Sequence, residues 1–273
     1  MKKYVNLFVF VFMVGTCFSQ GKAQTKSAVS YKNPVVDIAM PDPTVIKAAD
    51  GYFYVYATES TRNVPIMKSK NLVQWTYCNT AFTNKTRPRF EPKAGIWAPD
   101  INYINNKYVL YYAMSVWGGE QTCGIGVATA DSPQGPFTDH GKMFRSNEIG
   151  VQNSIDPSFL QYEGRNYLVW GSFRGIYVIE LTEDGLSLKP GAEKKRIAGT
   201  AFEAAYIHKH GDYYYMFASI GSCCEGIRST YKVVVGRSKK VWGPYKDKSG
   251  KPMLKNGYSL VIGANDHFVG NGH

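Results

Sequence analysis

Cysteine is scarce in this 273-residue chain, and its five cysteines fall in no metal-binding pattern. The absence of Cys-x-x-Cys or mixed His/Cys spacing argues against a zinc site. The four cysteines beyond the N-terminal run are too few for a disulfide framework in a protein of this size. A bond between the neighbours Cys223 and Cys224 would be strained, so we expect two buried thiols there.

The chain also lacks long apolar runs with helical spacing and long blocks of like charge. The formal net charge is +11, and a basic exported protein can bind nucleic acid or acidic polysaccharide. The basic residues are scattered, however, and the densest groups are only 193–196 and 238–240. We therefore interpret them as a solvated surface and expect no nucleic-acid partner. The 44% hydrophobic content and the 20 Tyr residues predict a packed protein rich in strands.

Residues 1–24 have the composition of a secretory signal peptide. Lys2 and Lys3 precede an apolar run over 5–18, and small and polar residues follow over 19–24. The run is too short to span a bilayer, so we expect a secreted or periplasmic protein without an integral membrane segment. An alternative is a lipoprotein signal in which Cys17 is acylated and anchored to the outer membrane, although the preceding residues match that pattern poorly.

Four segments repeat one pattern, in which a turn leads into aromatic and β-branched residues. Tyr54, Tyr108, Tyr167 and Tyr214 occupy equivalent places at intervals of 54, 59 and 47 residues. The pattern predicts strands over 51–57, 106–113, 164–171 and 211–218, with further strands over 64–69, 124–130 and 231–238. A repeat of about 50 residues with about four strands is typical of a propeller blade. A fifth unit begins near Gly257, and we expect an all-β, five-bladed β-propeller with a truncated fifth blade.

Three acidic residues precede the repeats at nearly constant distance. Asp42, Asp156 and Glu203 lie 12, 11 and 11 residues before the aligned Tyr of their units. We therefore expect their carboxylates to converge at the mouth of the central channel. Asp100 lies 8 residues before Tyr108, which predicts a place near this site but not at its centre, where it could contact the sugar as a substrate-binding residue. Because proline follows Asp42 and Asp156, we expect an extended or polyproline backbone at both.

Clustered carboxylates in a sugar-sized opening favour glycoside hydrolysis. In an inverting glycosidase one carboxylic acid protonates the leaving oxygen, and one carboxylate activates water on the opposite face of the sugar. A third carboxylate can adjust the acid by like-charge proximity.

Over residues 32–273 the chain resembles glycoside hydrolase family 43, the five-bladed arabinanases and related xylosidases and arabinofuranosidases. The motifs that carry the resemblance are "PDPTVI" at 41–46, "IWAPDI" at 96–101, "NSIDPSF" at 153–159, "FEAAYI" at 202–207 and "VGNGH" at 269–273. The resemblance implies that Asp42 is the general base and Glu203 the general acid. It implies that Asp156 orients the acid and modulates its pKa.

The segment "SCCEGIRSTY" at 222–231 resembles the endo-acting branch, which cleaves α-1,5-linked L-arabinan. Met40 and Pro41 before Asp42 depart from the His that many arabinanases have there. An exo-acting arabinofuranosidase or β-xylosidase therefore stays an alternative, as does a non-catalytic sugar-binding propeller. We expect a monomer.

The resemblance further implies a central ion, calcium or another, that a histidine of the last blade helps to hold through water, and His273 matches it. Because calcium prefers oxygen ligands, we expect His273 to orient waters or to tune the acids. No organic cofactor is expected.

Three further side chains are candidates for sugar contacts. Trp97, beside Asp100, could stack on a sugar ring or could be a core residue. Trp117 lies in a glycine-rich loop, where binding residues are common. Arg174 could bond a sugar hydroxyl or could be an ordinary surface residue.

Overall fold

A computed structural model describes residues 30–266, 268–270 and 272. The chain divides into two compact units, Met1–Lys32 and Asn33–His273. The predicted signal peptide, Cys17 and His273 lie outside the described residues. In the described part of the chain, no helix is long and apolar enough to cross a bilayer.

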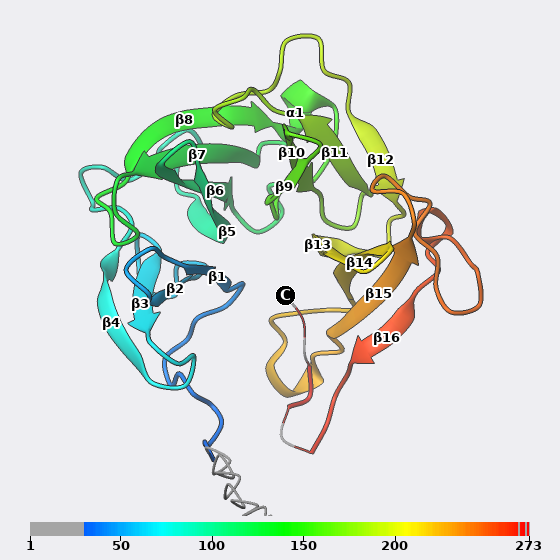
Figure 1. Ribbon diagram of the computed structural model, residues 1–273, viewed down its shortest axis with the longest axis horizontal. Helices are drawn as coiled ribbons and strands as arrows, with labels where there is room; N and C mark the ends of the chain where they lie inside the picture. Colours follow the sequence, from blue (N-terminus) through cyan, green and yellow to red (C-terminus); the bar gives the residue numbers. More distant parts are fainter. Residues whose placement is uncertain (1–29, 267, 271, 273) are drawn as a thin grey trace, which may run out of the picture. The chain divides into compact units, whose positions relative to one another are not determined.

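The described residues of the second unit form four antiparallel sheets of four strands each, and in every sheet the strands follow chain order. In Figure 1 the four sheets succeed one another around a common centre, with β1, β5, β9 and β13 innermost. The strands are β1 (Thr44–Lys47), β2 (Phe53–Tyr56), β3 (Pro65–Ser69), β4 (Trp75–Thr80), β5 (Gly95–Ile104), β6 (Lys107–Ser115), β7 (Gly124–Ala130), β8 (Thr138–Arg145), β9 (Ser158–Tyr162), β10 (Arg165–Trp170), β11 (Ile176–Glu180), β12 (Lys195–Ala198), β13 (Glu203–His210), β14 (Tyr213–Ile220), β15 (Lys232–Ser238) and β16 (Ser259–Ile262). In the part of the chain that the structure describes, three short helices interrupt the connections: α1 (Ser146–Ile149), η1 (Gly226–Arg228) and η2 (Met253–Lys255).

The repeat is confirmed as four propeller blades, because each aligned Tyr lies on the second strand of its sheet. The start of the fifth unit was placed wrongly. Residues 259–262 form β16, which pairs with β15 through Val235 and Ser259 and completes the fourth sheet. The misplacement has a simple cause: the long connection from β15 to β16 carries its own turns, and they imitate the start of a new repeat. A fifth blade stays a prediction.

Side chains between neighbouring sheets form the core, and the two middle sheets contribute from both faces. On β6, Tyr112 packs against the first sheet and Tyr111 against the third, because successive side chains of a strand point to opposite faces. On β10, Trp170 faces the second sheet and Val169 the fourth. This two-sided burial explains why these strands read as continuous apolar runs rather than alternating ones.

Candidate active site

The three predicted acids lie in one cavity of about 700 Å³. Asp42 lies two residues before β1, Asp156 two residues before β9, and Glu203 is the first residue of β13. The near-constant sequence offset therefore corresponds to equivalent positions at the entrance to three inner strands. Asp42 is half-buried, whereas Asp156 and Glu203 are only 6% and 7% exposed.

The backbone at the two Asp-Pro pairs corrects the sequence prediction. Asp42 has φ 52° and Asp156 has φ 59°, both in the left-handed region rather than extended. Asp is among the few residues that enter this region at moderate cost, because its short side chain forms local hydrogen bonds. Proline's bias on the preceding residue is thus overridden at the site, where strained backbone is commonly held in place by its surroundings.

Glu203 is fixed by two hydroxyl groups. Ser172 Oγ donates a hydrogen bond to Glu203 Oε2 at 2.7 Å, and the Tyr231 hydroxyl donates to Oε1. Ser172 is in turn held by Asn153, whose Nδ2 donates to Ser172 Oγ at 2.9 Å. A bulge at the start of β13 between Glu203 and Tyr206 turns the carboxylate toward the cavity. The side chain is therefore held in place before any substrate arrives.

Asp156 is a buried carboxylate that shares the cavity with Asp42 and Glu203. Burial, then the Glu203 carboxylate and then the Asp42 carboxylate raise the pKa of Asp156 well above its usual range. The backbone N–H of Ala204 donates to Asp156 Oδ2 at 3.2 Å, which opposes this rise. Asp156 thus retains its proton at a pH where an isolated carboxylate would lose it.

Asp42 is oriented from the first and second sheets. The Thr58 hydroxyl donates to Asp42 Oδ2 and accepts a hydrogen bond from the backbone N–H of Ala98 at 2.7 Å. Thr58 follows β2, and Ala98 lies in the bulge of β5 between Trp97 and Asp100.

Asp100 lies outside the residues that line the cavity. Its carboxylate accepts hydrogen bonds from the Phe159 backbone N–H at 2.7 Å, from Asn102 Nδ2 at 2.7 Å and from Thr44 Oγ1 at 3.5 Å. Desolvation raises the pKa of Asp100 to about 6. The expectation of a sugar contact does not fit this placement, because the carboxylate instead joins the inner strands of three sheets.

The two tryptophans do meet at the cavity. Trp97 and Trp117 both line it, with ring centroids 5.7 Å apart and planes inclined by 52°. Trp117 is 78% exposed, and Trp97 is half-buried. Arg174 is placed beside the cavity, where its Nε and Nη2 bond the two oxygens of Glu120 at 3.1 and 2.9 Å. Glu120 lines the cavity, whereas Arg174 is not among the lining residues. The sugar contact of Arg174 stays a prediction.

Comparison with known proteins agrees with this geometry. The model of "Glycosyl hydrolases family 43" matches residues 31–273. The chain belongs to glycoside hydrolase family 43. The predicted membership and the predicted glycosidase class are thereby confirmed.

Three relatives are close enough to compare with this family 43 chain. An extracellular endo-α-(1→5)-L-arabinanase of Bacillus subtilis is 38% identical over 85% of this chain and 75% of its own length. An extracellular exo-α-(1→5)-L-arabinofuranosidase of Cellvibrio japonicus is 35% identical over 85% and 73%. The structure of the Cellvibrio cellulosa α-L-arabinanase complexed with arabinohexaose superposes with a TM-score of 0.77, at 32% identity over 85% and 81% of the two chains.

Sequence reasoning missed the hydrogen-bond donors that hold the acids. Tyr231, Ser172 and Thr58 all line the cavity, and none was assigned a role. Tyr231 is the last residue of the segment 222–231, and the resemblance of that segment to the endo-acting branch could have indicated a role for it. Ser172 and Thr58 each stand two residues past the end of a second strand, at Trp170 and Tyr56, so their shared place in the repeat was a second signal.

The cysteine pair is a further correction. Cys223 is half-buried and Cys224 exposed, and both line the cavity instead of being buried in the core. The reason is that residues 221–231 form the connection between β14 and β15 at the cavity rather than a core strand.

The predicted ion has no ligand cluster within the described residues, where no group of three or more His, Cys, Asp and Glu could hold a metal. Since His273 lies outside them, calcium stays a prediction and takes no part in the chemistry below.

Proposed function

We propose that this family 43 chain hydrolyses α-1,5-linked L-arabinan with inversion at the anomeric carbon. The observation that carries the proposal is the convergence of Asp42, Asp156 and Glu203 in one cavity lined by two tryptophans. The named activities of the Bacillus and Cellvibrio relatives, and the arabinohexaose bound to one of them, support arabinan as the substrate.

In the proposed mechanism Glu203 protonates the leaving glycosidic oxygen. Asp156 resists ionisation, because burial and then the Glu203 and Asp42 charges raise its pKa, and it is proposed to orient the acid. Asp42 accepts a proton from the water that attacks the anomeric carbon from the opposite face. The glycosidic C–O bond breaks as the water C–O bond forms, and the two proton transfers return the site to its starting charge.

Trp97 and Trp117 are proposed to bind the neutral sugar chain. The C–H faces of a sugar pack on aromatic rings, and Trp117 offers a largely exposed ring at the edge of the cavity. Such contacts would position the scissile bond without adding charge near the three carboxylates.

We further propose that the protein is exported, consistent with the extracellular relatives, and that it acts as a monomer. Calcium near His273 remains part of the proposal, as a structural ion with oxygen ligands.

The direct test is incubation of the purified protein with linear arabinan, followed by reducing-sugar assay and chromatography of the products. A ladder of oligosaccharides supports endo cleavage, and a single small product supports the exo alternative suggested by the Cellvibrio relative. Activity on a xyloside without activity on arabinan would reject arabinan as the substrate. Binding of arabinohexaose without any release would reject hydrolysis altogether.

A further inference from the structure

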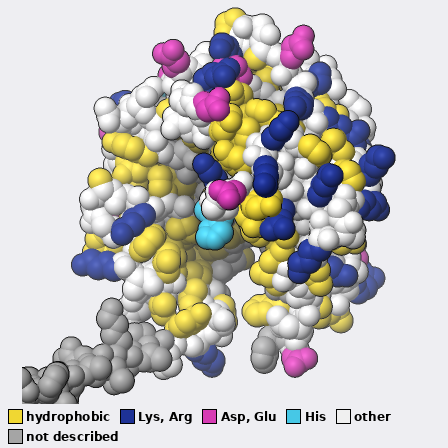
Figure 2. Space-filling model, turned by 45° about the vertical axis from the view of Figure 1, so that its right-hand side comes forward, with side chains coloured by type: hydrophobic (Ala, Val, Ile, Leu, Met, Phe, Trp, Pro, Cys, Tyr) yellow, Lys and Arg dark blue, Asp and Glu magenta, His cyan; other side chains and the backbone are white. Residues whose placement is uncertain are grey.

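Positive charge is concentrated in one part of the chain. Residues 194–255 contain 13 Lys and Arg but only four Asp and Glu, a net charge of +9, whereas the rest of the sequence contributes +2. This stretch comprises β12 to β15 and the connection that leads to β16. Figure 2 turns the right-hand side of Figure 1 forward, and Lys and Arg side chains cover much of its right half with few acids among them. The basic residues form no long block of like charge, yet they are concentrated in one region of the chain and of the fold.

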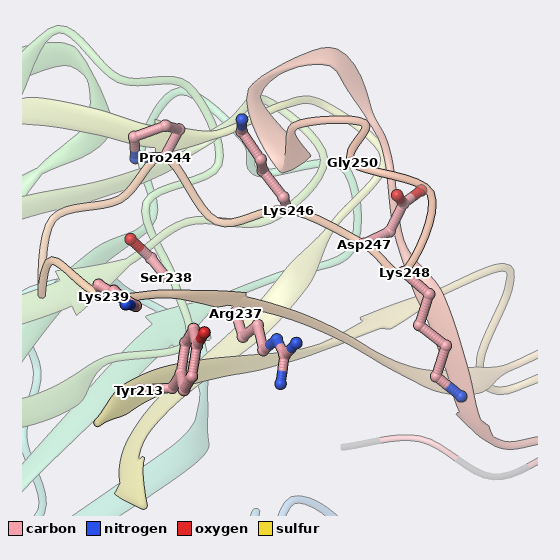
Figure 3. Close-up of a pocket in the computed structure, with 9 residues that line it drawn as sticks. All are labelled: Tyr213, Arg237, Ser238, Lys239, Pro244, Lys246, Asp247, Lys248 and Gly250. Carbon is pink, nitrogen blue, oxygen red and sulfur yellow. The ribbon is translucent and has the colours of Figure 1, made fainter. Parts of the chain in front are cut away.

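Within this region lies a pocket of about 350 Å³, here called the basic pocket. Four cationic side chains and one carboxylate line it, which gives a net charge of +3: Arg237, Lys239, Lys246, Lys248 and Asp247. Figure 3 shows these side chains around the β15 end and the following connection, with the Tyr213 ring beside Arg237.

No acidic partner neutralises the four cations. In the part of the chain that the structure describes, no carboxylate forms an ion pair with Arg237, Lys239, Lys246 or Lys248. Asp247 is committed to its own turn, since its Oδ1 accepts hydrogen bonds from the backbone N–H groups of Ser249 and Lys251, both at 2.8 Å. Hydrogen bonds from this turn lower the pKa of Asp247. The positive charge of the basic pocket is thus available to an anionic ligand.

Tyr213 gives the pocket an aromatic wall. The Arg237 Cζ lies 4.4 Å from the centroid of the Tyr213 ring, and the Lys239 Nζ lies 5.8 Å from it. Cations held beside an aromatic ring can bind a carboxylate while the ring packs against the C–H face of the attached sugar.

We propose that the basic pocket binds uronate residues of an acidic polysaccharide. The pocket volume lies at the small end of ligand sites, which suits one or two sugar residues rather than a flat lipid surface. The predicted export signal places the protein among extracellular polymers instead of nucleic acids. Charge, aromatic wall and size therefore favour a polyuronate over DNA or an anionic membrane.

The basic pocket is remote from the three acids of the active site. Glu203 pairs with Ser219 at one end of the β13–β14 hairpin, and His210 pairs with Tyr213 at the other. A strand of this length spans roughly 20–25 Å. A polyuronate bound at the basic pocket would hold the protein on an acidic matrix while the catalytic cavity stays open. The inference does not depend on the proposed activity.

The test is equilibrium binding of the protein to polygalacturonate at about 150 mM salt, where screening removes weak surface attraction. The variant R237Q/K239Q/K246Q/K248Q removes four charges from the pocket. The matched control K47Q/K70Q/K85Q/K93Q removes four exposed charges from the first sheet and the connection after it. We expect roughly tenfold or greater loss of affinity in the pocket variant and little change in the control.

Equal losses in the two variants, or no binding by the unmodified protein, would overturn the proposal. Tighter binding of a short DNA duplex or of phosphatidylserine vesicles than of polygalacturonate would also overturn it. Tyr213→Leu is expected to weaken polygalacturonate binding severalfold and to leave the weaker DNA binding unchanged; an equal effect on both ligands would reject the sugar-stacking role. Arabinan hydrolysis, measured in parallel, is expected to be the same in all variants, so failure here is distinguishable from failure of the proposed activity.

Discussion

Tyr231 donates a hydrogen bond to Glu203 from the connection that leads into β15, while Glu203 itself begins β13. Burial, and then the Glu203 charge, raise the pKa of Tyr231, so its hydroxyl stays protonated and remains a donor. The acid is thus held by a residue 28 positions away, on the connection between two strands of the same sheet.

Tyr231→Phe removes this hydroxyl and retains the ring. Loss of a hydrogen bond to a charged group costs about 1.5–3 kcal/mol, so we expect kcat on arabinan to fall roughly tenfold to hundredfold. We also expect a displaced pH profile, which a purely structural defect would not give. Tyr215→Phe is the matched control, because Tyr215 lies near the start of β14 and Glu203 pairs with Ser219 near its end. Equal losses in the two variants would contradict a specific role of Tyr231.

Glu203→Gln and Asp42→Asn remove the proposed acid and base. Each is expected to lower kcat by about 10²–10⁴-fold or more, with the fold and arabinohexaose binding retained. Asp212→Asn changes an exposed carboxylate of the β13–β14 turn and serves as control. A near-normal rate for Asp42→Asn would remove Asp42 as the base.

Asp156→Asn tests the coupling of the carboxylates through the pH profile of kcat. Replacement of an ionisable carboxyl by a neutral amide removes one member of a set of interacting carboxylates, whose ionisations depend on one another. We therefore expect a reduced rate and a displaced limb of the pH profile. An unchanged limb with a reduced rate would assign Asp156 a positioning role alone.

Asp156→Asn should also alter stability with a defined sign. Because the pKa of Asp156 is raised in the folded protein, this carboxyl lowers the stability of the fold. The loss of stability is absent below the unfolded pKa, grows as the pH rises above it and is complete above the folded pKa. We expect Tm to rise by roughly 2–5 °C at neutral pH. This gain should vanish as the pH falls below about 4, near the ordinary pKa of Asp. A gain that persists in acid would show a packing effect instead.

Cys223 and Cys224 offer a chemical probe of the cavity. Burial, and then the neighbouring Cys224 and Glu203, raise the pKa of Cys223 to about 12, so at neutral pH its thiol is a poor nucleophile. N-ethylmaleimide should therefore react first at the exposed Cys224, block the cavity and inactivate the enzyme. Arabinohexaose should protect the enzyme from inactivation by the reagent, and the Cys224→Ser variant should resist this inactivation. Inactivation of the Ser variant at the unmodified rate would mean that the reagent acts elsewhere, for example at Cys78.

The sequence predicted the parts of the structure that depend on local pattern. Turn residues followed by aromatic and β-branched runs located the second strand of all four sheets, because such strands need that composition wherever they occur. The constant offset before Tyr54, Tyr167 and Tyr214 located the three acids, because each blade repeats one geometry.

Features that depend on distant partners escaped prediction. The left-handed backbone at Asp42 and Asp156 is imposed by contacts between sheets, which a local proline rule cannot anticipate. The distance of Asp100 from Tyr108 predicted its place near the site. The backbone N–H of Phe159 that binds its carboxylate belongs to another sheet, which the sequence did not indicate. Cys223 and Cys224 resemble core residues by type, and only the course of the β14–β15 connection sets their exposure.

The anomeric configuration of the first product tests the central claim most directly. Proton NMR can follow the cleavage of an α-1,5-linked arabino-oligosaccharide before mutarotation mixes the anomers. Attack by a water molecule that Asp42 activates, opposite to Glu203, predicts the β-anomer as the first product. Initial appearance of the α-anomer would contradict the assignment of Asp42 as a base and would require a covalent intermediate.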